Sequence, residues 1–73
     1  MNLVPRVTNN RLEIFNADDG LLKKTLSLPS DANYGSPIVS GDTVTIGIQF
    51  NNGRNISRVY NIKTGSLVRE ISM

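Results

Sequence analysis

The chain has 73 residues, with eight Lys or Arg, six Asp or Glu and neither His nor Cys, so its formal net charge is +2. This length allows one domain, and a domain this small buries only about 60% of the surface that its unfolded chain exposes. Disulfides and zinc sites built from Cys and His are excluded as reinforcement, which leaves tight turns and association with other chains. The small, scattered positive charge does not indicate a nucleic-acid-binding protein.

Turn residues interrupt the sequence about every eight to twelve residues, which is typical of short antiparallel strands. No segment shows the apolar periodicity of a helix. The sequence therefore predicts an all-β fold. Its seven expected strands, in chain order, are Leu3–Thr8, Arg11–Ala17, Leu21–Leu28, Pro37–Ser40, Thr43–Phe50, Ile56–Ile62 and Leu67–Met73.

The predicted turns use residues that accept a positive φ. Asn9 and Asn10 suit a two-residue turn, because Asn tolerates this conformation better than other residues with a side chain. Residues 18–20 (DDG) are expected to turn the chain with Gly20 in the left-handed conformation, and residues 63–65 (KTG) repeat that arrangement. The other predicted turns are at 41–42 and 51–53.

The strand Thr43–Phe50 has the clearest alternation in the chain. Apolar residues fall at every second position, which is the period of a strand with one buried face. They are Val44, Ile46, Ile48 and Phe50. Two further aromatic residues, Phe15 and Tyr60, are also expected in the core.

An internal repeat relates two parts of the chain that are 45 residues apart. Residues 14–28 (IFNADDGLLKKTLSL) align without a gap with residues 59–73 (VYNIKTGSLVREISM). The repeated unit is a strand, a turn ending in Gly and a second strand, so it predicts a β-hairpin used twice. Four positions are identical: Asn16/Asn61, Gly20/Gly65, Leu22/Leu67 and Ser27/Ser72.

The stretch from Pro29 to Ser36 (PSDANYGS) contains turn residues without alternation. We therefore place a connector at residues 29–35. It separates a three-strand unit over residues 1–28 from a four-strand unit over residues 36–73, within a single domain.

The segment from Gly35 to Ile71 resembles one blade of a β-propeller of the quinoprotein-like or WD40-like kind. It has an opening Ser-Pro strand, a Gly-Asp turn, an alternating strand, an Asn/Gly turn, a third strand, a Lys-Thr-Gly turn and a last strand. The segment from Leu3 to Leu28 is similar to the last three strands of a preceding blade. The resemblance implies an antiparallel meander of about seven strands in two blade-like sheets, with a small sandwich or barrel as the alternative.

Two departures limit what the resemblance implies. Lys24 and Arg69 stand where quinoprotein repeats usually have Trp, and residues 16–17 (NA) and 61–62 (NI) stand where WD40 repeats have Trp-Asp. Neither a quinone cofactor nor WD40-type packing is therefore expected, and no cofactor is predicted. Fewer than two blades are present, whereas repeat proteins generally need about three, so we expect a homo-oligomer or a larger assembly.

Three residues are candidates for an interaction. Lys24 and Arg69 alternate in phase with apolar residues on their strands, so they could pair across a contact between chains or lie at the rim of a sheet. Tyr34, in the connector, is the third. No catalytic or metal site is predicted: the acidic turn at 18–20 suggests a calcium loop, but Lys63 replaces Asp18 in the second copy, so the repeated element needs the turn and not the charge.

The predicted function is that of a non-enzymatic structural module that docks on copies of itself or on a larger assembly, such as an accessory protein of a viral particle. The alternative is a lectin-like carbohydrate-binding module, and nucleic-acid binding ranks third. The N-terminal residues contain no apolar run long enough for a signal peptide or a membrane span. We therefore expect a soluble chain, in the cytoplasm or in a virion.

Overall fold

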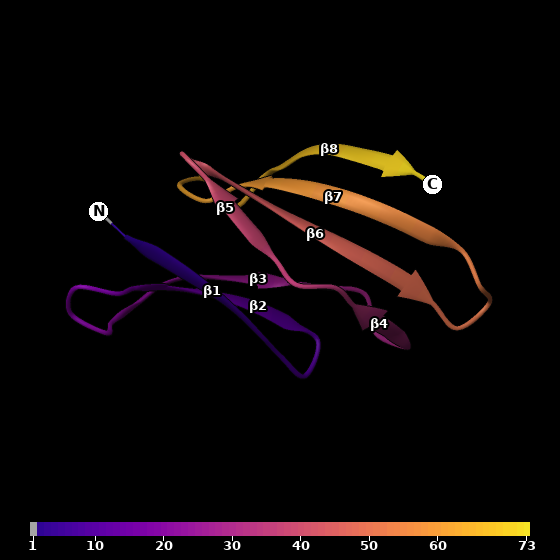
Figure 1. Ribbon diagram of the computed structural model, residues 1–73, viewed down its shortest axis with the longest axis horizontal. Helices are drawn as coiled ribbons and strands as arrows, with labels where there is room; N and C mark the ends of the chain where they lie inside the picture. The colour runs from indigo at the N-terminus through magenta and orange to yellow at the C-terminus, as the bar shows by residue number, and fades with distance from the viewer. Residues whose placement is uncertain (1) are drawn as a thin grey trace.

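The computed structural model describes residues 2–73, which form eight β-strands and no helix (Figure 1). All strand pairings are antiparallel, so the predicted all-β fold is confirmed. No helix that could cross a membrane occurs in the described range. The strands are β1 (Leu3–Thr8), β2 (Arg11–Asn16), β3 (Leu22–Ser27), β4 (Ala32–Tyr34), β5 (Ile38–Ser40), β6 (Thr43–Phe50), β7 (Asn55–Asn61) and β8 (Leu67–Ser72).

The strands form two sheets that lie one over the other (Figure 1). The first sheet has the order β1-β2-β3 and the second the order β4-β6-β7-β8. Strand β5 also pairs with β6, on the edge that β4 occupies further along. The two short strands thus share one edge of the second sheet, and β8 forms its other edge.

Strand β4 corrects the prediction of seven strands and of a connector without regular structure at residues 29–35. Ala32 pairs with Phe50 and Tyr34 with Ile48, so β4 is held by a strand that follows much later in the sequence. The Tyr34 hydroxyl also donates a hydrogen bond to the Pro29 carbonyl oxygen. Three residues are too few to show alternation, and a long-range pairing leaves no local pattern in the sequence.

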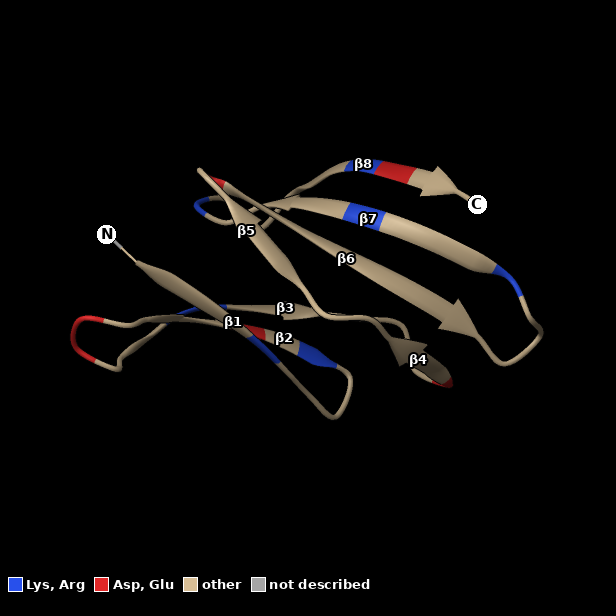
Figure 2. Ribbon diagram, in the orientation of Figure 1, with Lys and Arg blue, Asp and Glu red and all other residues tan. Residues whose placement is uncertain are grey.

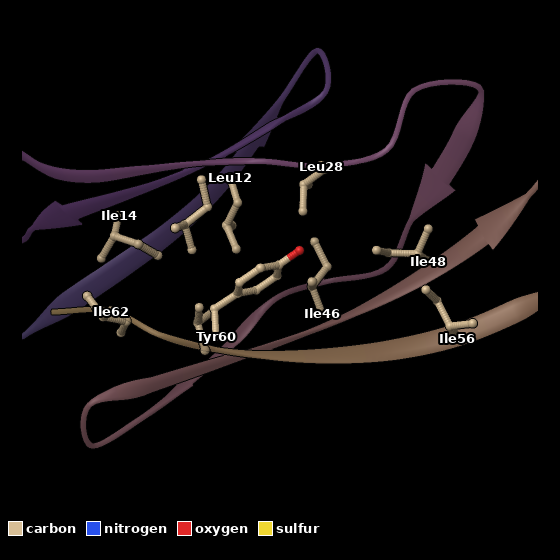
Figure 3. Close-up of a cluster of buried hydrophobic side chains, with 10 residues drawn as sticks. Leu12, Ile14, Leu28, Ile46, Ile48, Ile56, Tyr60 and Ile62 are labelled. Atoms are coloured by element: carbon tan, nitrogen blue, oxygen red, sulfur yellow. The ribbon is translucent and has the colours of Figure 1, made fainter. Parts of the chain in front are cut away.

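The core lies between the two sheets, inside a single chain (Figure 3). Buried side chains come from both layers, and burying each Leu or Ile in this way contributes about 1.5–3 kcal/mol. The predicted apolar face of β6 is confirmed, with Phe50 partly buried at its end. The prediction for Phe15 is wrong, because its half-buried ring lies outside this cluster. The buried residues are Leu12, Ile14, Leu26, Leu28, Val44, Ile46, Ile48, Ile56, Tyr60 and Ile62.

The two copies of the repeat make the same turn with the same hydrogen bonds. The Gly20 amide donates to the Asn16 carbonyl oxygen at 2.7 Å, and the Gly65 amide donates to that of Asn61 at 2.8 Å. In each turn the Asn side chain accepts a hydrogen bond from the amide two residues later, at 2.8 Å in the first copy and 2.9 Å in the second. Both glycines have a positive φ, +73° and +77°, as predicted.

Candidate functional site

A β-bulge occurs at the same place in both copies of the repeat. In the first sheet Ile14 pairs with Lys24, whereas Phe15 pairs with Leu22, so Lys23 is an extra residue. In the second sheet the register shifts between the equivalent residues, and Val68 is the extra one. The bulge places Leu22 on the opposite face from Lys24, because paired residues share a face. The predicted phase, in which Lys24 and Arg69 share a face with the apolar residues of their strands, is therefore wrong for Leu22 and Leu67.

The two sheets use opposite faces of the repeat to form the core. Ile14 is completely buried between the sheets, whereas its equivalent Val59 lies on the outer face of the second sheet. Conversely, Tyr60 is buried between the sheets, and its equivalent Phe15 lies on the outer face of the first. The two sheets therefore have the same orientation in the stack. The face that contains Val59 and the face that contains Phe15 remain uncovered.

The outer face of the second sheet, which we call the Val59 face, is partly apolar. Three large apolar side chains on it are between 45% and 75% exposed, and they surround small residues such as Thr45 and Gly47. Arg69 lies beside Val59 in the register and is exposed. The Val59 face consists of Ile38, Thr45, Gly47, Val59, Arg69, Ile71 and Met73, together with the polar residues Thr43, Gln49, Asn55 and Ser57.

The outer face of the first sheet, which we call the Phe15 face, carries an apolar row that crosses all three strands. Val4 pairs with Phe15, and Phe15 pairs with Leu22. Val4 and Leu22 are 47% and 48% exposed. The charged residues Arg6 and Glu13 lie opposite each other in the strand register, on the same face. This face therefore has an apolar half and a polar half.

Lys24 lies between the sheets, at one end of the core. A Cβ atom added to Gly65 would lie 3.0 Å from Lys24 Cε and 3.4 Å from Leu26 Cδ2, so the turn at 63–65 rests directly on this part of β3. Lys24 and Lys63 line the same opening, about 550 Å³ in volume, whose apolar wall includes Ile62. Lys24 therefore lies at the mouth of the core.

The three predicted interaction residues do not form one site. Lys24 lies inside the sandwich, Arg69 lies on the Val59 face, and Tyr34 lies on β4 at the far edge of the second sheet. Tyr34 borders a hollow of about 280 Å³, which is also lined by Gly47 and Met73 of the Val59 face and by three residues with side-chain amides. Those amides belong to Asn33, Gln49 and Asn55.

Of the ion pairs between described residues, one is half-buried, and it joins β7 to β8. Arg58 Nε donates to Glu70 Oε1 at 2.8 Å, and another guanidinium nitrogen donates to the Tyr60 hydroxyl at 3.1 Å. Burial alone would lower the pKa of the Arg58 guanidinium, but its hydrogen bonds to Tyr60 and Glu70 outweigh that effect, so its pKa is raised. This cluster fixes the edge strand β8. Among residues 2–73, no group of three or more acidic side chains could hold a metal ion.

Sequence reasoning identified Lys24 and Arg69 as a repeated cation but missed that their surroundings differ. It also missed the apolar row on the Phe15 face, because the bulge hides the phase of Leu22. Comparison of the chain with protein-family models, with curated proteins and with solved structures finds no match.

Proposed function

We propose that the chain is a non-enzymatic structural module that docks onto copies of itself in a larger assembly. The observation that carries the proposal is that both outer sheet faces bear large exposed apolar side chains. Val4 and Leu22 lie on one face, and Ile38, Ile71 and Met73 lie on the other. Apolar residues grouped on a face typically mark a protein contact, whereas single exposed ones do not.

The accessible surface area of the single chain is that of a compact monomer. The chain exposes 4590 Å², close to the roughly 4,450 Å² expected for a compact monomer of 8.0 kDa. The fold therefore buries a normal amount of surface without a partner. Docking would add an interface to a sandwich whose core is already buried. The support for docking is the position of the exposed apolar side chains on the two outer faces.

The two glutamates, which lie within strands, give no support to an enzyme. Glu70 is held by Arg58, and Glu13 faces Arg6 across the strand pair. The sequence supplies neither His nor Cys as a base or nucleophile. A small subunit that decorates a viral shell or joins parts of a viral tail would suit such a module, and electron microscopy of particles from the native source tests that setting.

Light scattering coupled to size exclusion tests self-docking. The mass should rise from one chain toward a multiple of it as the protein concentration increases from low micromolar to millimolar. A mass of one chain over this whole range contradicts the proposal.

A second function, glycan binding, is favoured by the hollow beside Tyr34. The amides of Asn33, Gln49 and Asn55 can both donate and accept hydrogen bonds, as sugar hydroxyls require. Binding on a glycan array that is lost in the variant Gln49→Ala would support this function, and the absence of any binding would dismiss it.

A further inference from the structure

We propose that copies of the chain associate head to tail, so that the Val59 face of one copy packs on the Phe15 face of the next and Arg69 approaches the neighbour's Asp18. This inference rests on the proposed self-docking and specifies its geometry. It follows from the way in which the two sheets already pack within one chain.

The faces of the two sheets pair in one way inside the molecule. Within the chain, the face of the first sheet that contains Ile14 packs on the face of the second sheet that contains Tyr60. The faces left open contain Val59, the equivalent of Ile14, and Phe15, the equivalent of Tyr60. Each open face thus belongs to a type that already binds the other type inside the molecule.

The side chains that would meet in the contact resemble those on the inner faces of the two sheets. The row on the inner face of the second sheet is Val44, Tyr60 and Leu67, which are neighbours in the strand register; Val44 and Tyr60 are buried in the core, whereas Leu67, on the edge strand, is 49% exposed. The equivalent row on the Phe15 face again consists of Val, an aromatic residue and Leu, namely Val4, Phe15 and Leu22. The row of residue types on this inner face is therefore present a second time, on the outside.

The opposing face is preserved in the same way. Lys24, Leu26 and Leu28 face the second sheet inside the molecule, and their equivalents on the Val59 face are Arg69, Ile71 and Met73. Each equivalent residue keeps the cationic or apolar character of its counterpart. Ile71 and Met73 are exposed in the single chain, whereas Leu26 and Leu28 are buried.

The charges near the two repeated turns differ. Inside the molecule Lys24 rests on the turn that contains Gly65, and it lines one opening together with Lys63, which is paired with Asp42 at 3.5 Å in the same opening. In the proposed contact Arg69 would rest on the turn that contains Gly20, where Asp18 replaces Lys63. The two turns lie at the same end of the molecule, one acidic and one basic (Figure 2). The contact between copies therefore pairs opposite charges.

A contact between two different faces is heterologous. Such contacts generate rings when the rotation from copy to copy closes and open filaments when it does not. A symmetric dimer in which like faces meet would instead leave Arg69 of one copy away from Asp18 of the other, so it would lack this pair of opposite charges.

Charge-reversal variants test the geometry. Arg69→Glu and Asp18→Lys should each weaken self-association by about tenfold or more, because each opposes like charges at the contact. An equimolar mixture of the two variants should reassemble, since the reversed charges attract each other at one junction and the native pair forms at the next. Asp18→Lys introduces the residue found at the equivalent turn position, and its side chain enters none of the described hydrogen bonds or ion pairs.

The control is Arg54→Glu, a charge reversal in the turn between β6 and β7, which should leave association unchanged. Far-ultraviolet circular dichroism checks that each variant is folded. If the wild-type chain stays monomeric, the proposed function itself fails. If the wild type assembles but Asp18→Lys does not weaken assembly, or if the mixture does not recover it, the head-to-tail geometry is overturned and self-docking stands.

Discussion

Replacing Ile14 and Val59 by Ala, one at a time, tests whether the two copies of the repeat use opposite faces. The two residues occupy equivalent positions, but Ile14 is fully buried between the sheets and Val59 lies on the open face. Truncating a buried Ile to Ala typically costs about 2–5 kcal/mol of unfolding free energy, because it removes apolar contacts and leaves a cavity. Truncating Val59 should cost about 1 kcal/mol or less, which is the range of strand propensities.

The size of the Ile14 effect matters against the total stability. A domain of this length is stable by roughly 4–11 kcal/mol, so Ile14→Ala removes a large share of that and can unfold part of the population. Ile14→Val, which introduces the residue of the second repeat, should cost only about 0.5–1.5 kcal/mol and keeps the test readable.

Urea denaturation followed by circular dichroism measures these differences, at a concentration where the transition midpoint no longer depends on dilution. The slope of the unfolding free energy against urea should be unchanged, so that the midpoints report stability. A loss for Val59→Ala equal to or greater than that for Ile14→Ala would refute the assignment of faces.

Two further predictions concern the turn and the ion pair. Gly20→Ala and Gly65→Ala should each lower the unfolding free energy by about 1 kcal/mol, because both positions have a positive φ. In thermal unfolding of the monomer the loss should be larger for Gly65→Ala, because only the new Cβ at residue 65 would meet Lys24 and Leu26. Equal losses would contradict the packing of this turn on β3. Glu70→Gln should lower the unfolding free energy by about 1 kcal/mol or less, with the difference shrinking in 1 M salt, since the pair is partly exposed; a difference that does not change with salt would show that charge is not its source.

The repeat and its turns could be predicted from the sequence because their causes are local. Asn16 and Asn61 bind the amides of their own turns, and Gly20 and Gly65 adopt the conformation that favours Gly. Strand β4 could not be predicted, because it depends on pairing with β6 across the second unit.

Which face of each sheet forms the core also could not be predicted from the sequence. Ile14 and Val59 are both β-branched and apolar, so their composition does not reveal that one is buried and the other open. The bulge occurs in both copies, and the alignment therefore runs through it without a gap. Of the residues in the proposed contact, the repeated cation was identified from the sequence, whereas the charge on Asp18 was interpreted as dispensable because only the turn geometry repeats.

The most direct test of open, complementary faces uses the absence of Cys from the sequence. A spin label on the single-cysteine variant Asp19→Cys, mixed with wild-type protein labelled with nitrogen-15, reports which amides approach the acidic turn of another copy. We predict broadening of β8 amides around Arg69, increasing with concentration. Broadening confined to the acidic turn, or no broadening at any concentration, would contradict the account.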